Sequence, residues 1–182
     1  MPLEDFDHQH FPSTVRAKVG KEVKAPSPPA AFHAKLQTPF AVLGIRTAGD
    51  LLTGIEYLPC NVAMLAPVNK LAAKICDQIE RYLADAEFRF DLPFEFRGTA
   101  FQQRVWRAIC AIPSGKTLTY LDVARRLKSA PRPVGGACGA NRIPLVIPCH
   151  RVVGSSGIGG FMNSRGGQPI EIKQWLLRHE HA

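Results

Sequence analysis

The sequence predicts an α+β protein in which a small antiparallel sheet, packed on a helix, precedes a mostly helical region. Two strand-like segments lie early in the chain, at residues 40–45 and 51–57, with a turn at 48–50 between them. Helical patterns separated by glycine and proline fill most of the second half. Because strands followed by helices are typical of α+β folds, we expect two domains, at residues 31–95 and 96–182.

The first domain is predicted to be a hairpin covered by one helix. The segments at 40–45 and 51–57 have a strand-like pattern on either side of the turn at 48–50, which indicates an antiparallel hairpin. Pro67 is suited to open a helix, and a further short strand at residues 88–92 would complete the sheet. Apolar residues recur every four positions from Lys70 to Ala84, namely Leu71, Ile75, Ile79 and Leu83.

Two cysteines of this domain are predicted to be buried. Cys60 lies near the end of the second strand, and Cys76 lies beside the helical stripe. Free cysteine behaves as a small apolar residue and is often found in cores. No recognisable chemistry occurs in residues 31–95, so we expect this domain to be a scaffold.

The second domain begins after a linker at residues 94–98. Thr99 is placed to cap a helix that ends at Pro113-Ser-Gly115. Trp106 and Cys110 on this helix are expected in the core. The other apolar positions are Phe101, Val105, Ile109 and Ile112.

A helix-turn-helix is predicted next. Thr119 stands three residues before Asp122, the spacing of a capping box at a helix start. This helix places Tyr120, Val123 and Leu127 on one face. After a break at residues 129–131, a second short helix from Pro133 to Ala140 completes the motif.

The side chains on the second helix are unusually small. Glycine destabilises an isolated helix, so its use here indicates that something approaches the backbone closely. The preceding helix and a DNA groove are both suitable neighbours, and Arg132 at the helix start is expected to project outward. The small residues are Gly135, Gly136, Ala137, Gly139 and Ala140.

The residues most suited to chemistry lie at 141–153. A turn marked by Asn141 leads into a short apolar run at 145–147, which predicts a buried strand, and Pro148 follows. We therefore expect Cys149 at the rim of the core, with His150 beside it. Cysteine is a nucleophile as thiolate, and a nearby imidazole lowers its pKa or takes its proton.

Two interpretations of Cys149 stay open on these residues alone. Adjacent side chains seldom point at each other, so a water or a tight turn would have to connect the thiol to His150. A buried apolar thiol without function is the alternative.

Charge is divided unevenly along the chain. Residues 1–96 hold 10 Lys+Arg against 12 Asp+Glu, a net of −2, whereas residues 97–182 hold 13 against 3, a net of +10, and the sum is +8. Such a basic half favours a polyanionic partner such as nucleic acid, although a solvated basic face has the same composition.

Composition narrows the class of protein further. A hydrophobic fraction of 46% argues against disorder over most of the chain. Neither a run of eighteen apolar residues nor an apolar leader occurs, so we expect no membrane partner and no secretion. Five cysteines, an odd number without a paired framework, fit a cytoplasmic location.

Residues 1–30 are predicted to be a flexible arm, because they are rich in proline and lack periodicity. His8 and His10 in this arm are expected in solvent. No cluster of Cys and His with metal-ligand spacing accompanies them, so no metal site is predicted.

Several spaced blocks resemble the O6-alkylguanine-DNA alkyltransferases. These blocks are Arg132-Pro-Val-Gly-Gly-Ala-Cys-Gly-Ala-Asn141, Ile147-Pro-Cys-His-Arg-Val152 and Gly157-Ile-Gly-Gly-Phe161. A Phe-Gln, Val-Trp and Ile-Pro-x-Gly block from Phe101 to Gly115 also matches. The resemblance is strong over about residues 100–182 and covers 35–99 only in layout.

The resemblance implies a DNA repair protein that moves an alkyl group from O6 of guanine onto its own cysteine, once and irreversibly. Cys149 would be the acceptor, and His150 would take its proton, through water. The ending Leu176-Leu-Arg-His-Glu180 matches the family pattern in which this glutamate pairs with the block histidine. Glu180 would therefore orient His150.

The resemblance also implies how the base reaches the cysteine. Tyr120 would crowd the phosphate beside the target, turn the nucleotide and donate a proton to the departing guanine. Arg132 would fill the place of the extruded base, with Gly135, Gly136 and Ala137 of its helix against DNA.

Further roles follow from the same blocks. Asn141 would hold the turn that joins the recognition helix to the active-site strand. The backbone carbonyls of Cys149 and Val152 would accept from the guanine amine, while Phe161 and Arg151 complete the binding residues. Phe161 stands where the family often has tyrosine, and residues 162–170 are longer than expected.

The expected partner is double-stranded DNA that contains O6-alkylguanine, with O4-alkylthymine as a further substrate, and no metal or organic cofactor is required. We expect a monomer, with several molecules along one DNA.

Two other functions stay open. A Cys-His-Glu thiol hydrolase would turn over without DNA, and a helix-turn-helix module would bind DNA without transferring anything. An alkyltransferase-like signalling protein is disfavoured, because those proteins replace the cysteine.

Overall fold

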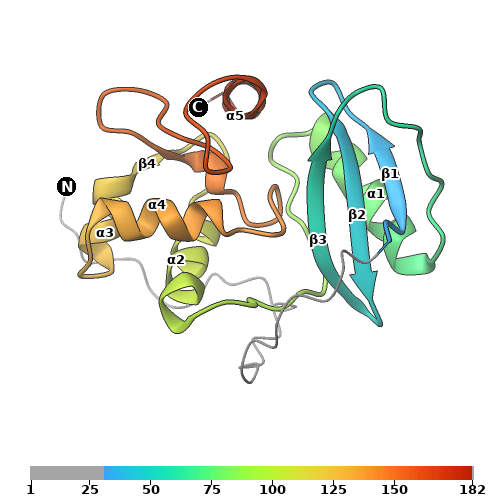
Figure 1. The fold of residues 1–182 in the computed structure, drawn as a ribbon, viewed down its shortest axis with the longest axis horizontal. Helices are drawn as coiled ribbons and strands as arrows, with labels where there is room; N and C mark the ends of the chain where they lie inside the picture. Colours follow the sequence, from blue (N-terminus) through green and yellow to red (C-terminus); the bar gives the residue numbers. More distant parts are fainter. Residues whose placement is uncertain (1–30, 182) are drawn as a thin grey trace.

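The computed structural model describes residues 31–181, which form a sheet region and a helical region packed side by side (Figure 1). The predicted arm, with His8 and His10, lies outside these residues. The sheet region (residues 31–95) contains β1 (Ala34–Gln37), β2 (Val42–Ala48), β3 (Leu51–Leu58) and α1 (Lys70–Ala84). The predicted α+β class is confirmed. The helical region (residues 96–181) contains α2 (Ala100–Cys110), β4 (Leu118–Thr119), α3 (Tyr120–Arg126), α4 (Pro131–Gly139), the 3-10 turn η1 (Cys149–Arg151), β5 (Val152–Val153) and α5 (Gln168–His179).

The sheet is antiparallel, in the order β1-β2-β3. The predicted hairpin is confirmed, with Ile45 opposite Ile55 and a turn that passes through Gly49 at φ 54°. The third strand is β1, which pairs with the other edge of β2. α1 packs against β1 and β2 on one face of the sheet, and the other face meets the helical region.

The strand predicted at residues 88–92 is wrong. This segment runs beside α1, where the Gln78 side chain satisfies the backbone of Asp91 in both directions, at 3.0 and 2.8 Å. Just beyond this segment, Phe94 forms an isolated bridge with Leu52 of β3. A helix side chain therefore takes the hydrogen bonds that a neighbouring strand would have used.

The helix predicted from Lys70 to Ala84 is confirmed, but Asn69 rather than Pro67 marks its start, because the Asn69 side chain accepts from the Ala72 amide. Cys76 is buried as predicted. The prediction for Cys60 is wrong, since it is exposed just after β3 ends.

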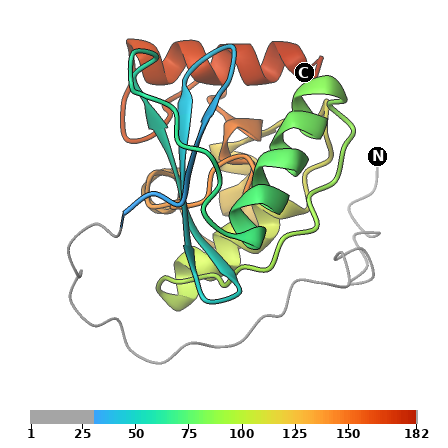
Figure 2. The same ribbon diagram turned by 90° about the vertical axis from the view of Figure 1, so that its right-hand side faces the viewer.

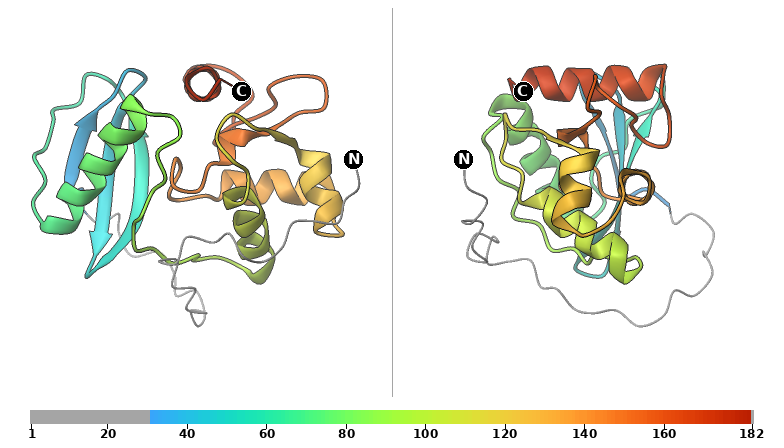
Figure 3. Two further views of the ribbon diagram at one scale, coloured as in Figure 1. Left: turned by 180° about the vertical axis from the view of Figure 1, so that it is seen from behind. Right: turned by 90° about the vertical axis from the view of Figure 1, so that its left-hand side faces the viewer.

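Capping boxes start two helices of the helical region, at Thr99 for α2 and at Thr119 for α3. α3 and α4 form the predicted helix-turn-helix, and both pack against α2. Trp106 of α2 is buried as predicted, and its indole N–H donates to the Ala137 carbonyl of α4 at 2.8 Å. Seen from behind, α2, α3 and α4 gather at the side away from the sheet (Figure 3).

α5 bridges the two regions. It runs across one end of the molecule, and its C-terminal end comes beside the end of α1 (Figure 2). Two pairs of aromatic rings join the sheet to the segments around α5. Phe40 and Trp175 have ring centroids 4.7 Å apart, and Tyr57 and Phe161 are 6.0 Å apart.

The buried strand predicted at residues 145–147 is also wrong. Leu145 and Ile147 are buried, but the chain turns there, with Leu145 at φ 70° and the Ile147 amide bonded to the Ile143 carbonyl. A short apolar run shows burial more reliably than it shows backbone conformation.

Candidate active site

Cys149 is the first residue of η1, and Asn141 holds the turn before it. The Asn141 side-chain amide donates to the Ile147 carbonyl at 2.9 Å and to Cys149 Sγ at 3.3 Å. Its oxygen accepts from the Ile143 amide at 3.0 Å. Asn141 thus closes the loop between α4 and η1, and it also contacts the thiol directly.

Cys149 lines a cavity of about 640 Å³ between the helix-turn-helix and the segment that precedes α5. The thiol is buried, so it is reached through this cavity rather than from the general surface. The cavity is lined by Tyr120, Pro131, Arg132, Gly135, Cys138, Gly139, Cys149 and the segment 160–165.

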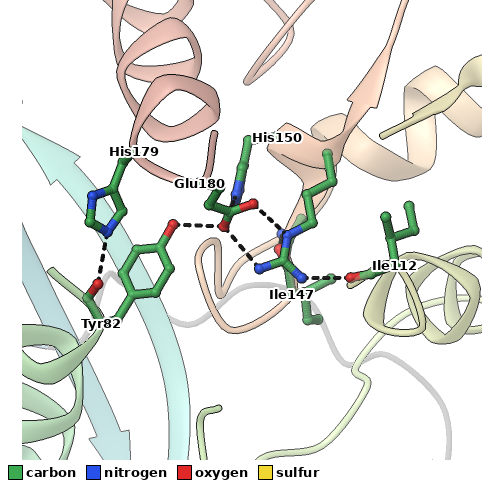
Figure 4. Close-up of polar contacts among 8 residues, drawn as sticks. Tyr82, Ile112, Ile147, His150, His179 and Glu180 are labelled. Carbon is green, nitrogen blue, oxygen red and sulfur yellow. Dashed lines mark hydrogen bonds and ion pairs between the residues drawn. The ribbon is translucent and has the colours of Figure 1, made fainter. Parts of the chain in front are cut away.

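A buried carboxylate lies behind the thiol. Glu180 Oε1 is 2.9 Å from His150 Nε2, and Arg151 donates to both carboxylate oxygens at 2.8 Å. Arg151 also donates to the Ile112 carbonyl at 2.6 Å. The predicted partners His150 and Glu180 are therefore in contact, within a network that is almost closed to solvent (Figure 4).

Burial and hydrogen bonding set the protonation of this pair. Burial alone would raise the pKa of Glu180, but the hydrogen bonds from His150 and Arg151 outweigh it and lower the pKa to about 2. Burial lowers the pKa of His150, although Glu180 acts in the opposite direction. His150 is therefore a neutral imidazole whose Nε2–H donates to the carboxylate, which leaves the lone pair on Nδ1.

That lone pair is available for a proton. Among the residues described, His150 Nδ1 is one of three buried side-chain polar atoms without a hydrogen-bond partner. Buried polar atoms of this kind usually bind an ordered water or a ligand. The imidazole thus has the geometry of a general base held by Glu180.

The thiol itself is held as a neutral group in the resting protein. Burial raises the pKa of Cys149, while the hydrogen bond from Asn141 and the charge of Lys173 act against it. Lys173 of α5 is buried, and its ammonium donates to the Val152 carbonyl at 2.6 Å and to the Gly160 carbonyl at 3.0 Å. A buried cation near the sulfur favours the thiolate when the proton leaves.

Tyr120 stands at the wall of the cavity, where its hydroxyl donates to the Gly160 carbonyl at 2.9 Å. Burial raises the pKa of this phenol well above its ordinary value, with the neighbouring cysteines adding to the effect. Tyr120 is therefore protonated, and its hydroxyl hydrogen would reach a bound group only by leaving the Gly160 carbonyl.

The residues expected to contact DNA differ in their exposure to solvent. Arg132 is exposed at the rim of the cavity. Gly135 lines the cavity, and Gly136 faces open space, since a Cβ added there would meet nothing within 4 Å. Ala137 is buried, and its backbone carbonyl accepts from the Trp106 indole, so its contact with DNA stays a prediction.

Three more of the expected binding residues are engaged or buried inside the protein. The Arg151 guanidinium donates to Glu180 and to the Ile112 carbonyl, so in this structure it is engaged inside the protein, and its contact with DNA stays a prediction. The Val152 carbonyl already accepts from Lys173, which leaves one lone pair for a base. Phe161 is buried and forms part of the cavity wall.

Two residues of the site had no signal in the sequence. Lys173 lies beside the apolar positions of α5, where a lysine is normally solvated. Tyr82 of α1 donates its hydroxyl to Glu180 Oε1 at 2.8 Å, across 98 positions of sequence. Only the periodic burial of α1 could have suggested that Tyr82 faces inward.

Within residues 31–181, no three His, Cys, Asp or Glu side chains are grouped so as to hold a metal ion. The same part of the chain has no helix long and apolar enough to cross a membrane.

Comparison with known proteins identifies a family model and several relatives of this chain. A family model described as the DNA-binding domain of 6-O-methylguanine DNA methyltransferase matches residues 100–182. An inducible methylated-DNA–protein-cysteine methyltransferase of Bacillus subtilis is 42% identical over 102 residues, which are 55% of this chain and 55% of that protein. The match thus spans about half the length of that relative.

Longer matches come from mycobacteria. The methylated-DNA–protein-cysteine methyltransferase of Mycobacterium bovis is 34% identical over 155 residues, which cover 81% of this chain and 90% of that protein. The structure of Mycobacterium tuberculosis OGT in complex with DNA is similar with a TM-score of 0.68 and 32% identity, over 81% of this chain and 91% of that one. The chain therefore belongs to the methylated-DNA–protein-cysteine methyltransferase family.

Proposed function

We propose that this protein repairs DNA by moving the alkyl group of O6-alkylguanine in a duplex onto Cys149 Sγ, once per molecule. The observation that carries the proposal is the position of Cys149. It lies in a cavity that opens beside the helix-turn-helix, and its neighbour His150 is a neutral imidazole bound to a buried carboxylate. A nucleophile, a base and an orienting group are thus next to a surface suited to DNA.

Access to the base requires it to leave the duplex, because O6 of guanine lies within the stack. The surface of α4 carries small side chains, and Gly136 faces open space, so this helix could approach a groove of the DNA closely. Arg132 at the start of α4 would occupy the space left by the extruded base. Phosphate contacts by other basic residues of the helical region would offset the cost of unstacking, which is a few kcal/mol.

The chemical step is a direct displacement. His150 takes the Cys149 proton at Nδ1 through a bridging water, and Lys173 stabilises the thiolate. The sulfur then attacks the alkyl carbon, so that an S–C bond forms while the C–O6 bond breaks. The guanine leaves with the electron pair of that bond and takes the Tyr120 hydroxyl proton. Solvent returns a proton to Tyr120 and removes one from His150, so the net change is transfer of the Cys149 proton to guanine.

The product explains why the reaction occurs once. A thioether is not hydrolysed by water, so Cys149 stays alkylated, and no cofactor is needed because the protein itself is the acceptor. The cavity of about 640 Å³ is large enough for a base, and O4-alkylthymine is a second substrate to test. Five free cysteines also suit the reducing cytoplasm, where we place the protein, with access to DNA.

The test is the intact mass of the protein after mixing with a short duplex that contains one O6-methylguanine. We expect a gain of one methyl group per chain, mapped by digestion to Cys149. Cys149→Ser should bind the duplex equally well and gain nothing. Binding without a mass change in the wild-type protein would support a DNA-binding module, and neither binding nor transfer would support a thiol hydrolase.

A further inference from the structure

The sheet region reaches the buried carboxylate through one side chain. Tyr82 lies in the last turn of α1, and its hydroxyl donates to Glu180 Oε1 at 2.8 Å. Both side chains are almost fully buried. In Figure 4 the phenol points from α1 toward the carboxylate.

Three donors share one oxygen of Glu180. Oε1 accepts from Tyr82, from His150 Nε2 and from one Arg151 nitrogen, whereas Oε2 accepts from a second Arg151 nitrogen. His150 and Tyr82 therefore compete for the same lone pairs and the same negative charge. A change in either donor must alter the strength of the other contact.

Tyr82 is held rigidly in this position. The last carbonyls of a helix have no partner within the helix. The Tyr82 carbonyl is one of these in α1, and it accepts from His179 Nε2 at 2.8 Å. The Tyr82 ring also meets the His179 ring edge-on, with centroids 5.1 Å apart, and contacts Phe90 at 5.5 Å. The ring contacts with His179 and Phe90 thus aim the hydroxyl at Glu180.

We propose that Tyr82 is a positioning residue for the reaction of Cys149, whose hydroxyl fixes Glu180 Oε1 against His150 and limits the charge that His150 feels. This inference rests on the proposed function, in which His150 acts as the base. It gives the sheet region a part in the chemistry, although that region contains no residue of the cysteine block.

The protonation of Tyr82 supports this role. Burial, together with the neighbouring Glu180 charge, raises the pKa of the phenol far above its ordinary value, so the hydroxyl always donates. The other titratable or charged groups that face the His150–Glu180 pair are Arg151 and Cys149 of η1 and Lys173 of α5. Tyr82 comes from the sheet region, as does Tyr57 of β3, whose buried hydroxyl interacts with Cys149 and Tyr82.

The direction of the effect follows from charge. Without the Tyr82 hydroxyl, Glu180 Oε1 keeps more negative charge for His150. The imidazolium form of His150 is then stabilised, and the pKa of His150 rises. Because the base must be neutral to accept a proton, the acid side of the pH–rate profile should move to higher pH.

The experiment uses the full chain and measures how fast iodoacetamide alkylates Cys149 across pH, with the cysteine identified by peptide mass. Tyr82→Phe removes only the hydroxyl, and we expect the apparent pKa of the profile to rise by about half a unit, as for one hydrogen bond near a titrating pair. Replacing Tyr82 with 3-fluorotyrosine makes a stronger donor, and the profile should shift to lower pH.

His179→Phe is the matched control. It removes the other hydrogen bond between α1 and α5 but keeps a ring beside Tyr82 and Trp175. It should lower the free energy of unfolding while leaving the apparent pKa of Cys149 alkylation unchanged. If His179→Phe and Tyr82→Phe shifted the apparent pKa of the profile equally, Tyr82 would be a structural contact and not a positioning residue. The same would hold if neither Tyr82→Phe nor the 3-fluorotyrosine variant shifted the profile.

The alkylation assay keeps this inference separate from the proposed function. A wild-type protein that fails to take a methyl group from DNA would overturn the repair activity, yet the reactivity of Cys149 with iodoacetamide would still report on the Tyr82 contact. Conversely, the protein could transfer methyl groups normally while both Tyr82 variants leave the pH profile of Cys149 alkylation unchanged. That result would overturn only the role of Tyr82.

Discussion

The sheet region and the helical region differ in where their charged side chains lie. The sheet region pairs its charges at the surface, as in Arg46 with Glu56, whose side chains are 19% and 50% exposed. The helical region instead buries Glu180 and Lys173, holds Arg151 half-buried against Glu180, and leaves other basic residues such as Arg132 exposed. Surface pairs contribute little, whereas buried charges are costly unless they are fully partnered. Charge in the helical region is therefore gathered in part around the thiol, whereas the charge pairs of the sheet region lie at the surface.

The largest effect should come from removing the buried carboxylate. Glu180→Gln leaves the Arg151 guanidinium without its anion and weakens the hold on His150. Breaking a buried pair from one side typically costs about 3–5 kcal/mol, so we expect a loss of that order in urea unfolding. The matched change in the sheet region, Glu56→Gln, should cost less than about 1 kcal/mol.

The same carboxylate predicts how stability depends on pH. Its pKa is lowered in the folded protein to about 2 from an ordinary value of 4.5. Since the folded state holds the proton less tightly than the unfolded state, the stabilisation is complete above about 4.5 and is lost as the pH falls toward 2. In Glu180→Gln this part of the acid unfolding should disappear, and an unchanged acid profile would contradict the network.

Local signals in the sequence predicted the parts of this site that depend on neighbours along the chain. Thr119 and Asp122 form the expected capping box, and the block around Cys149 places His150 beside it. Glu180 was found through the family pattern of the chain end. These features rely on short spacings, which a sequence displays directly.

The remaining parts depend on tertiary placement. Tyr82 meets Glu180 only because α1 and α5 end side by side. Lys173 is buried because two backbone carbonyls lie where its ammonium ends, which no local pattern reveals. The turn at residues 145–147 escaped prediction for the related reason that burial and strand conformation look alike in a short apolar run.

A smaller effect is expected from the buried cation. Lys173→Met keeps most of the side-chain length but removes the positive charge near Cys149, so the pKa of the thiol should rise further. We expect alkylation of Cys149 by iodoacetamide at neutral pH to slow roughly tenfold, equivalent to about one pKa unit. Lys74→Met on the exposed face of α1 is the control, and similar rates in both variants would show that Lys173 does not act on the sulfur.

Arg132 tests whether the basic surface acts on duplex DNA specifically. Arg132→Ala should slow methyl transfer from a duplex about tenfold, and transfer from free O6-methylguanine base should hardly change, because only the duplex requires extrusion. Arg81→Ala in the sheet region removes an exposed charge of the same type and should affect neither substrate. Equal slowing of both substrates by Arg132→Ala would remove its role in base extrusion.

The smallest effects should come from the helix caps, and they separate stability from function. Asn69 caps α1 and Thr119 caps α3, each by accepting from a backbone amide. Replacing either residue with alanine should cost about 1 kcal/mol in unfolding experiments. Thr119→Ala should also slow methyl transfer, because Tyr120 at the cavity wall is the first residue of the helix that Thr119 caps, whereas Asn69→Ala should leave the rate unchanged. If Asn69→Ala slowed transfer as much as Thr119→Ala, general loss of stability would explain both, and the contrast between the two regions would fail at this level.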